Sequence, residues 1–291
     1  MKSMLKILIL IICLAVIVLA VKSCKAGQSV TTAKYKIGNV EFIAVLDVSR
    51  EMPKTLIPNQ DNPMVAQIFK DKQGIPASIN AFVVKTKDKT ILIDAGNKGG
   101  NIVKNLQSIS INPQDVNIIF LTHMHGDHVG GLLDADNNRV FTNAVVYVNK
   151  AEYDYWLKTP YASLVKMLKK AYGDNLKFLD IGKNNVVAEI TPIAAPGHTP
   201  GHTIFEIASN GDKILVIGDL MHIIPLQTAD PSISIVYDTD QAMAAKTRAK
   251  ILKYVCENNI KIAGIHVPFP AVGKIIKGEA PAQYQFQPLA K

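Results

Sequence analysis

The chain has 291 residues, enough for one large domain or two small domains with a full hydrophobic core. Hydrophobic residues make up 48% of the sequence, which excludes a disordered chain, and three cysteines are too few for a disulfide-stabilised scaffold. Lysine and arginine exceed aspartate and glutamate by 32 to 24, a formal net charge of +8. Taken alone, this charge would suggest nucleic acid or an anionic surface as a partner.

Residues 1–26 have the pattern of an export leader. Lys2 and Lys6 precede an unbroken apolar run over residues 7–21, which is signal-peptide length and short for a membrane span. Cleavage after Ala26, lipidation of Cys24 and an uncleaved membrane anchor are the three outcomes that the pattern leaves open. We expect an exported protein, periplasmic or membrane-anchored and facing outward, with one large domain over residues 27–291.

The leader also accounts for much of the basic charge. It carries four lysines and no acidic residue, so its removal lowers the net charge from +8 to about +4. The charge is therefore poor evidence for nucleic acid, and we expect no nucleic-acid partner. Attachment to a membrane would depend on the leader alone.

The rest of the chain alternates strand and helix patterns. Short apolar runs, two pairs of them joined by hairpin turns, predict strands at 36–48, 81–86, 90–94, 117–121, 145–148, 190–195, 202–208, 213–218 and 260–265. Helices are predicted at 101–108, from the N-cap Asn149 to about Lys170 with a break at Pro160, and at 239–258 with Thr239 as N-cap. This order predicts one α/β domain with two sheets and outer helices.

Three of the seven histidines lie in one short segment, THMHGDH at residues 122–128, directly after a predicted buried strand. His123 and His125 can converge on one metal ion, while Asp127 and His128 can face a second. Imidazole and carboxylate ligands without a nearby thiolate favour zinc, with manganese or iron as alternatives. A solvated histidine-rich loop would not explain why the segment lies between an apolar strand and a Gly-Gly pair.

Three further predicted strands end at residues that commonly bind metals. His198 follows the strand at 190–195, Asp219 follows that at 213–218, and His266 follows that at 260–265. One such residue at a strand end is usually structural. Three of them, in a chain that also has THMHGDH, indicate a metal centre at a shared sheet edge.

With Asp94 in the segment ILIDAG, these motifs resemble those of the metallo-β-lactamase superfamily of hydrolases in order and spacing, from about residue 40 to residue 266. The resemblance implies a four-layered αββα sandwich with two Zn²⁺ per chain at one edge of the two sheets. It implies one metal on His123, His125 and His198, a second on Asp127, His128 and His266, and Asp219 shared between them. Asp94 would orient a ligand histidine or the loop that carries the motif.

The resemblance also implies hydrolysis by a hydroxide that bridges the two metals. Metal binding lowers the pKa of water toward neutrality, and the metals stabilise the developing oxyanion. Asp127 or Asp219 would handle the proton. His222 lies where acyl-homoserine lactonases of this fold carry a tyrosine that contacts the substrate, so it is either a hydrogen-bond donor in the pocket wall or a loop residue without a role.

The segments at 220–252 and 264–275 resemble the subgroup of methyl parathion hydrolase and related secreted lactonases. The expected substrate is therefore a small lactone, aryl ester or organophosphate triester. The alternatives are a glyoxalase II-like thioesterase or a β-lactamase and, in another class, an iron-dependent persulfide dioxygenase. A homodimer is a further expectation from this subgroup. The candidates for an apolar pocket are Phe82, Trp156, Met221, Leu226 and Phe269.

Overall fold

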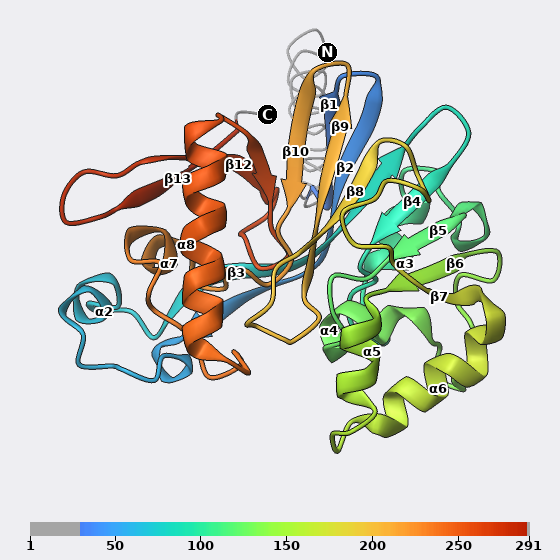
Figure 1. Cartoon of the computed structure of the whole chain (residues 1–291), viewed down its shortest axis with the longest axis horizontal. Coiled ribbons are helices and arrows are strands. Elements are labelled where there is room, and N and C mark those ends of the chain that lie inside the picture. Colours follow the sequence, from blue (N-terminus) through green and yellow to red (C-terminus); the bar gives the residue numbers. More distant parts are fainter. Residues whose placement is uncertain (1–29, 290–291) are drawn as a thin grey trace, which may run out of the picture. The chain divides into compact units, whose positions relative to one another are not determined.

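Two β-sheets face each other in residues 30–289, which are the residues described by the computed structural model (Figure 1). The expected leader at residues 1–26, with its cleavage and lipidation sites, lies outside this range. Among the described residues, none of the helices has the length and apolar character needed to cross a membrane.

The first sheet has seven strands in the order of the sequence. Its first four strands pair antiparallel and its last four pair parallel. The strands are β1 Thr32–Ile37, β2 Val40–Pro53, β3 Gly74–Lys85, β4 Thr90–Ile93, β5 Ile118–Phe120, β6 Val145–Val148 and β7 Leu176–Phe178.

The second sheet has six strands in the order β13-β12-β11-β10-β9-β8. All of its pairs are antiparallel except β10 with β11. The strands are β8 Ile190–Ala194, β9 Thr203–Ser209, β10 Asp212–Val216, β11 Lys261–Ala263, β12 Val272–Lys277 and β13 Tyr284–Pro288.

Helices cover the outer faces of both sheets, which gives the expected four-layered αββα sandwich (Figure 1). The helices are α2 Pro63–Ile68, α3 Ile102–Gln107, α4 Gly126–Val129, α5 Lys150–Trp156, α6 Ala162–Tyr172, α7 Ile224–Ala229 and α8 Gln241–Glu257. Four single turns of 3₁₀ helix connect them, at Lys54–Leu56, Pro113–Asp115, Gly130–Leu132 and Gly173–Asn175. Helices α3, α5 and α6 pack on the first sheet, and α8 packs on the second.

The alternation of side chains along the central strands builds two cores. Ile91 and Ile93 of β4 point into the core between the sheets, while Leu92 belongs to the core under α3 and α6. Phe120 of β5 stacks on Phe205 of β9, with ring centroids 5.1 Å apart, so the two sheets are joined by direct aromatic contact. Because both faces of these strands are buried, their sequences are continuously apolar.

Most of the predicted elements are present, and the differences have physical causes. The strand expected at 36–48 is the end of β1 and the start of β2, joined by a turn in which Gly38 has φ of +54°. A Cβ at Gly38 would lie 2.0 Å from the Ser209 carbonyl oxygen, so this close approach requires glycine. Strands β7, β12 and β13 were not predicted. For β13 the reason is that Tyr284–Pro288 is a mostly exposed edge strand without an apolar run.

The predicted N-cap of α8 was wrong by one residue. Asp240 caps the helix, and its carboxylate accepts a hydrogen bond from the Met243 N–H at 2.9 Å. The Thr239 hydroxyl instead donates to the Gly197 carbonyl at 3.2 Å. The start of α8 is therefore attached to the loop that carries His198, whose carbonyl accepts from the Thr239 N–H.

Replacing Asp240 with alanine should lower the free energy of unfolding by about 1 kcal/mol, because the cap accepts an otherwise unpaired helix N–H. Asp240→Asn keeps an acceptor of similar length and should be nearly neutral. Urea unfolding followed by circular dichroism measures both changes. Equal stability of Asp240→Ala and the wild type would contradict the cap.

Candidate metal centre

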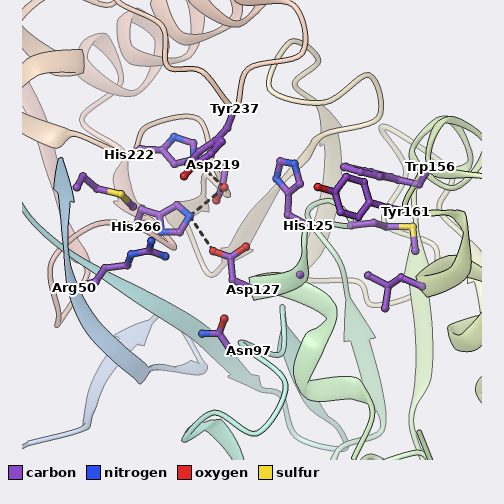
Figure 2. Close-up of a pocket in the computed structure, with 14 residues that line it drawn as sticks. Arg50, Asn97, His125, Asp127, Trp156, Tyr161, Asp219, His222, Tyr237 and His266 are labelled. Carbon is purple, nitrogen blue, oxygen red and sulfur yellow. Dashed lines mark hydrogen bonds and ion pairs between the residues drawn. The ribbon is translucent and has the colours of Figure 1, made fainter. Parts of the chain in front are cut away.

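The side chains expected at a metal centre come together at one edge of the two sheets. Each follows the end of a strand: THMHGDH follows β5, His198 follows β8, Asp219 follows β10 and His266 follows β11. Figure 2 shows Asp219 and His266 on one side of a cavity, with Asp127 below them and His125 opposite. Residues as distant in sequence as 123 and 266 thus share one site.

A first group of potential ligands consists of His123, His125, His198 and Asp219, whose ligand atoms all lie within 4.8 Å of one another. His125 Nδ1 is 2.8 Å from His123 Nε2 and 3.1 Å from His198 Nε2. Three imidazole nitrogens that converge beside a carboxylate form a donor set that suits zinc.

A second group consists of Asp127, His128 and His266, again within 4.8 Å. Asp219 lies between the two groups, with Oδ2 3.4 Å from His198 Nε2 and 3.1 Å from His266 Nε2. His128 Nε2 and Asp219 Oδ1 are buried 3.2 Å from each other, and neither makes a hydrogen bond among the described residues. Buried polar atoms rarely stay unpaired, so these residues fit a divalent cation bound among them.

Asp94 orients the second group. Its Oδ2 is 2.8 Å from His128 Nδ1, and it also accepts hydrogen bonds from the Thr122 N–H and hydroxyl. This contact leaves His128 Nε2 facing the centre, which is how an outer carboxylate fixes the ring of a ligand histidine. The predicted contact between Asp94 and a histidine of the motif is confirmed.

Two other histidines are held in the same way by residues that the sequence did not reveal. His198 Nδ1 is 2.9 Å from Asp238 Oδ1, and His266 Nδ1 donates to the Ser78 carbonyl at 3.0 Å. The buried guanidinium of Arg248 donates to Asp238 Oδ2 at 3.2 Å. No motif marks Asp238, Arg248 or Ser78, since each lies far along the chain from the histidine that it supports.

The charges of the site favour cations. Burial alone would raise the pKa of Asp219, but the surrounding histidines, His128 and His266 foremost, hold it well below its usual value. Burial alone would lower the pKa of His198, but hydrogen bonds to Asp219 and Asp238 raise it to about 9. The carboxylates therefore stabilise positive charge at the position where the ligand nitrogens converge.

His202 and His222 have different surroundings. His202 accepts a hydrogen bond from the Asp219 N–H at Nε2 and donates to the Ala195 carbonyl, so it positions the Asp219 backbone. His222 Nε2 is 3.0 Å from Asp219 Oδ2, and its ring stacks on His266. Its Nδ1 is buried and has no partner among the described residues.

A cavity of about 470 Å³ opens over these groups, and its floor contains His125, Asp127, Asp219, His222 and His266. Its walls combine apolar and polar side chains, namely Arg50, Met52, Asn97, Met124, Trp156, Tyr161, Leu164 and Tyr237. Figure 2 shows Trp156 and Tyr161 together beside His125, with Tyr237 beside His222.

Of the five predicted pocket residues, only Trp156 lines this cavity. Phe82 and Met221 belong to the core between the sheets, and Leu226 packs in a small cluster beside α2. Phe269 lies partly buried against the core of the second sheet. These predictions were wrong because closeness to a motif in sequence does not determine which way a side chain points.

Comparisons with known proteins agree with this geometry. The sequence matches the metallo-beta-lactamase superfamily over residues 74–255. It is 32% identical over 119 residues to an N-acyl homoserine lactonase of Bacillus sp, an alignment that covers 40% of this chain and 43% of the lactonase. The chain thus spans less than half the length of this curated relative.

Two solved structures share the fold over nearly their whole length. One is AidC, a dizinc quorum-quenching lactonase in complex with a product, which has a TM-score of 0.82 and 28% identity and covers 89% of this chain and 98% of its own. The other is the hydrolase AbOPH in the beta lactamase superfamily, with a TM-score of 0.82, 30% identity and coverage of 91% and 99%. The chain belongs to the metallo-β-lactamase superfamily and is a metal-dependent hydrolase.

Proposed function

We propose that the protein is a dinuclear zinc hydrolase that opens the ring of a small lactone. The observation that carries this proposal is the position of Asp219 between the two groups of potential ligands, with Oδ2 3.4 Å from His198 Nε2 and 3.1 Å from His266 Nε2, on the floor of a 470 Å³ cavity. The named activities of N-acyl homoserine lactonase and AidC support the lactone as the substrate class.

The ligand assignment follows the two groups. His123, His125 and His198 would hold one zinc ion, Asp127, His128 and His266 would hold the other, and Asp219 would contact both. Two such ions supply a Lewis acid and a water molecule of lowered pKa when bound. Asp94, Asp238 and the Ser78 carbonyl fix the rings that point at them.

The remaining groups of the cavity would handle the proton and the substrate. Asp127 and Asp219 are the carboxylates that line it among the described residues, so the proton from the attacking water passes to one of them. Asp127 is 23% exposed and Asp219 only 2%, which favours Asp127 for exchange with solvent. His222, whose Nε2 is 3.0 Å from Asp219 Oδ2, would contact the substrate from the floor of the cavity.

The walls favour a substrate with a small polar ring and an apolar tail. Trp156 and Leu164 provide an apolar surface beside His125, while Asn97 and Arg50 supply hydrogen-bond donors on another side. An acyl chain on Trp156 would place a lactone carbonyl over the polar floor, because pockets of this kind orient a ligand with a few polar groups.

Removing the metal with a chelator should lower lactone hydrolysis by about 100-fold or more, and zinc should restore it, because the proposed mechanism depends on metal ions to lower the pKa of the attacking water. Elemental analysis should find two zinc ions per chain. In a panel of lactones, aryl esters, organophosphate triesters, thioesters and β-lactams, lactones should have the highest kcat/KM. Full activity of metal-free protein would contradict the mechanism, and a faster triester would replace the substrate class.

Replacing Asp238 with asparagine should weaken zinc binding at His198 by about 10- to 100-fold, because the amide no longer fixes the His198 tautomer with a charge. Competition with a chromophoric chelator measures this affinity. Asp240→Asn, two residues away and exposed, is the matched control and should bind zinc like the wild type. Equal zinc affinity in both variants would show that Asp238 does not support a ligand.

We also propose that residues 1–26 direct export and that residues 27–291 form the mature domain, as a homodimer. Expression of the full chain followed by cell fractionation and N-terminal sequencing should find the mature chain outside the cytoplasm, beginning near residue 27 or acylated at Cys24. Cytoplasmic protein with an intact leader would contradict export.

Light scattering of the purified protein should give twice the chain mass if the mature domain is a homodimer.

A further inference from the structure

A buried carboxylate outside the ligand groups connects the two loops that carry the first group. Glu152 lies in the first turn of α5, and its side chain is fully buried. It forms no ion pair with any cationic side chain among residues 30–289; instead, four protein groups donate hydrogen bonds to it. Burying a carboxylate is costly, so four charge-assisted hydrogen bonds are needed to stabilise it.

One oxygen of Glu152 holds the loop after β5. Oε1 accepts a hydrogen bond from the Met124 N–H at 3.0 Å, and Met124 lies between His123 and His125. The same oxygen accepts from the Trp156 indole N–H at 2.5 Å. The Trp156 ring packs edge-on against His125, with centroids 5.1 Å apart, and lines the cavity.

The other oxygen holds the loop after β8. Oε2 accepts from the Thr199 hydroxyl at 2.7 Å and from the Gly201 N–H at 3.0 Å, both just after His198. A Cβ at Gly201 would lie 2.2 Å from the Glu152 backbone nitrogen, so this loop packs directly on the first turn of α5. Each carboxylate oxygen thus serves one ligand loop.

Capping of the N-terminus of α5 does not explain why the Glu152 side chain is buried. Asn149 already caps α5, with its side chain accepting from the Ala151 N–H. An acidic residue at the third helical position usually turns back to the N-cap N–H. Glu152 turns inward instead, to groups 28 and 47 residues away in the chain.

We propose that Glu152 is a positioning residue that sets the separation of His123 and His125 from His198, and that it couples this separation to the cavity wall through Trp156. The role rests on the proposed metal function, since it is defined by the zinc site that these three histidines form. Asp94 acts on the second group of ligands, so loss of Glu152 should affect the first group selectively.

The test is the zinc affinity of Glu152→Gln. The amide nitrogen donates rather than accepts, so one of the two loops loses its acceptor and meets a second donor. The affinity of the first group should fall about 10- to 100-fold, as for loss of other outer partners of ligand histidines. Competition with a chromophoric chelator measures the zinc affinity of the first group. The measurement is made in a His266→Ala background, in which the second group has lost one of its ligands.

The second group, measured in a His123→Ala background, should change less than about threefold under the same substitution. Glu279→Gln is the matched control, because Glu279 is an exposed glutamate without an ion pair among the described residues. It should leave both affinities unchanged. Circular dichroism confirms that each variant is folded before its affinity is compared.

Two milder variants keep the inference testable if Glu152→Gln does not fold. Thr199→Val removes one donor to Oε2 and should weaken the first group about three- to tenfold, the effect of one lost hydrogen bond. Trp156→Phe removes the indole donor and part of the wall, so it should raise KM for the lactone more than it lowers kcat.

Unchanged zinc affinity of the first group in folded Glu152→Gln, or in Thr199→Val if the former is unfolded, would overturn the positioning role. An equal loss in both groups would also overturn it, since that would indicate general destabilisation. Failure of the wild type to bind zinc would instead overturn the proposed function, so the two failures are distinguishable.

Discussion

The structure depends on one buried carboxylate among imidazole rings. Asp219 is 2% exposed and lies within 3.6 Å of nitrogens from His123, His128, His198, His222 and His266. Such a charge is stable in the interior only if cations or hydrogen-bond donors surround it, and here the surrounding groups are ring nitrogens that can carry a proton or bind a metal. The arrangement therefore requires protons or metal ions at the point where strands of both sheets end.

Carboxylates outside the ligand groups connect the histidines around Asp219 to the rest of the fold. Asp94 holds His128, Asp238 holds His198, and Glu152 joins the loops that carry His123, His125 and His198. Each carboxylate is itself fixed by backbone donors, hydroxyls or the buried Arg248. The site is thus part of the packing between sheets, loops and helices, which limits how far its ligands can move without loss of stability.

The cavity above the site has a different origin from its floor. The floor comes from the strand ends that carry the family motifs, whereas most of the walls come from β2, the segment from the end of α5 to the start of α6, and the segment that leads to α8. Apart from Met124, which lies within THMHGDH, the wall residues lie outside the ligand motifs. The shape and polarity of the upper cavity therefore depend on Trp156, Tyr161, Tyr237 and Arg50 rather than on the ligand candidates.

The sequence by itself determined the fold class and the identity of the ligand candidates. Ligand residues directly follow apolar strands, and a strand end fixes where its next residue lies, so THMHGDH, His198, Asp219 and His266 were recognisable without coordinates. Only the tertiary structure revealed Asp238, Glu152 and the cavity walls. The ligand loops that Asp238 and Glu152 hold lie 28 to 49 residues away, and such contacts depend on how loops and helices pack, which no local pattern encodes.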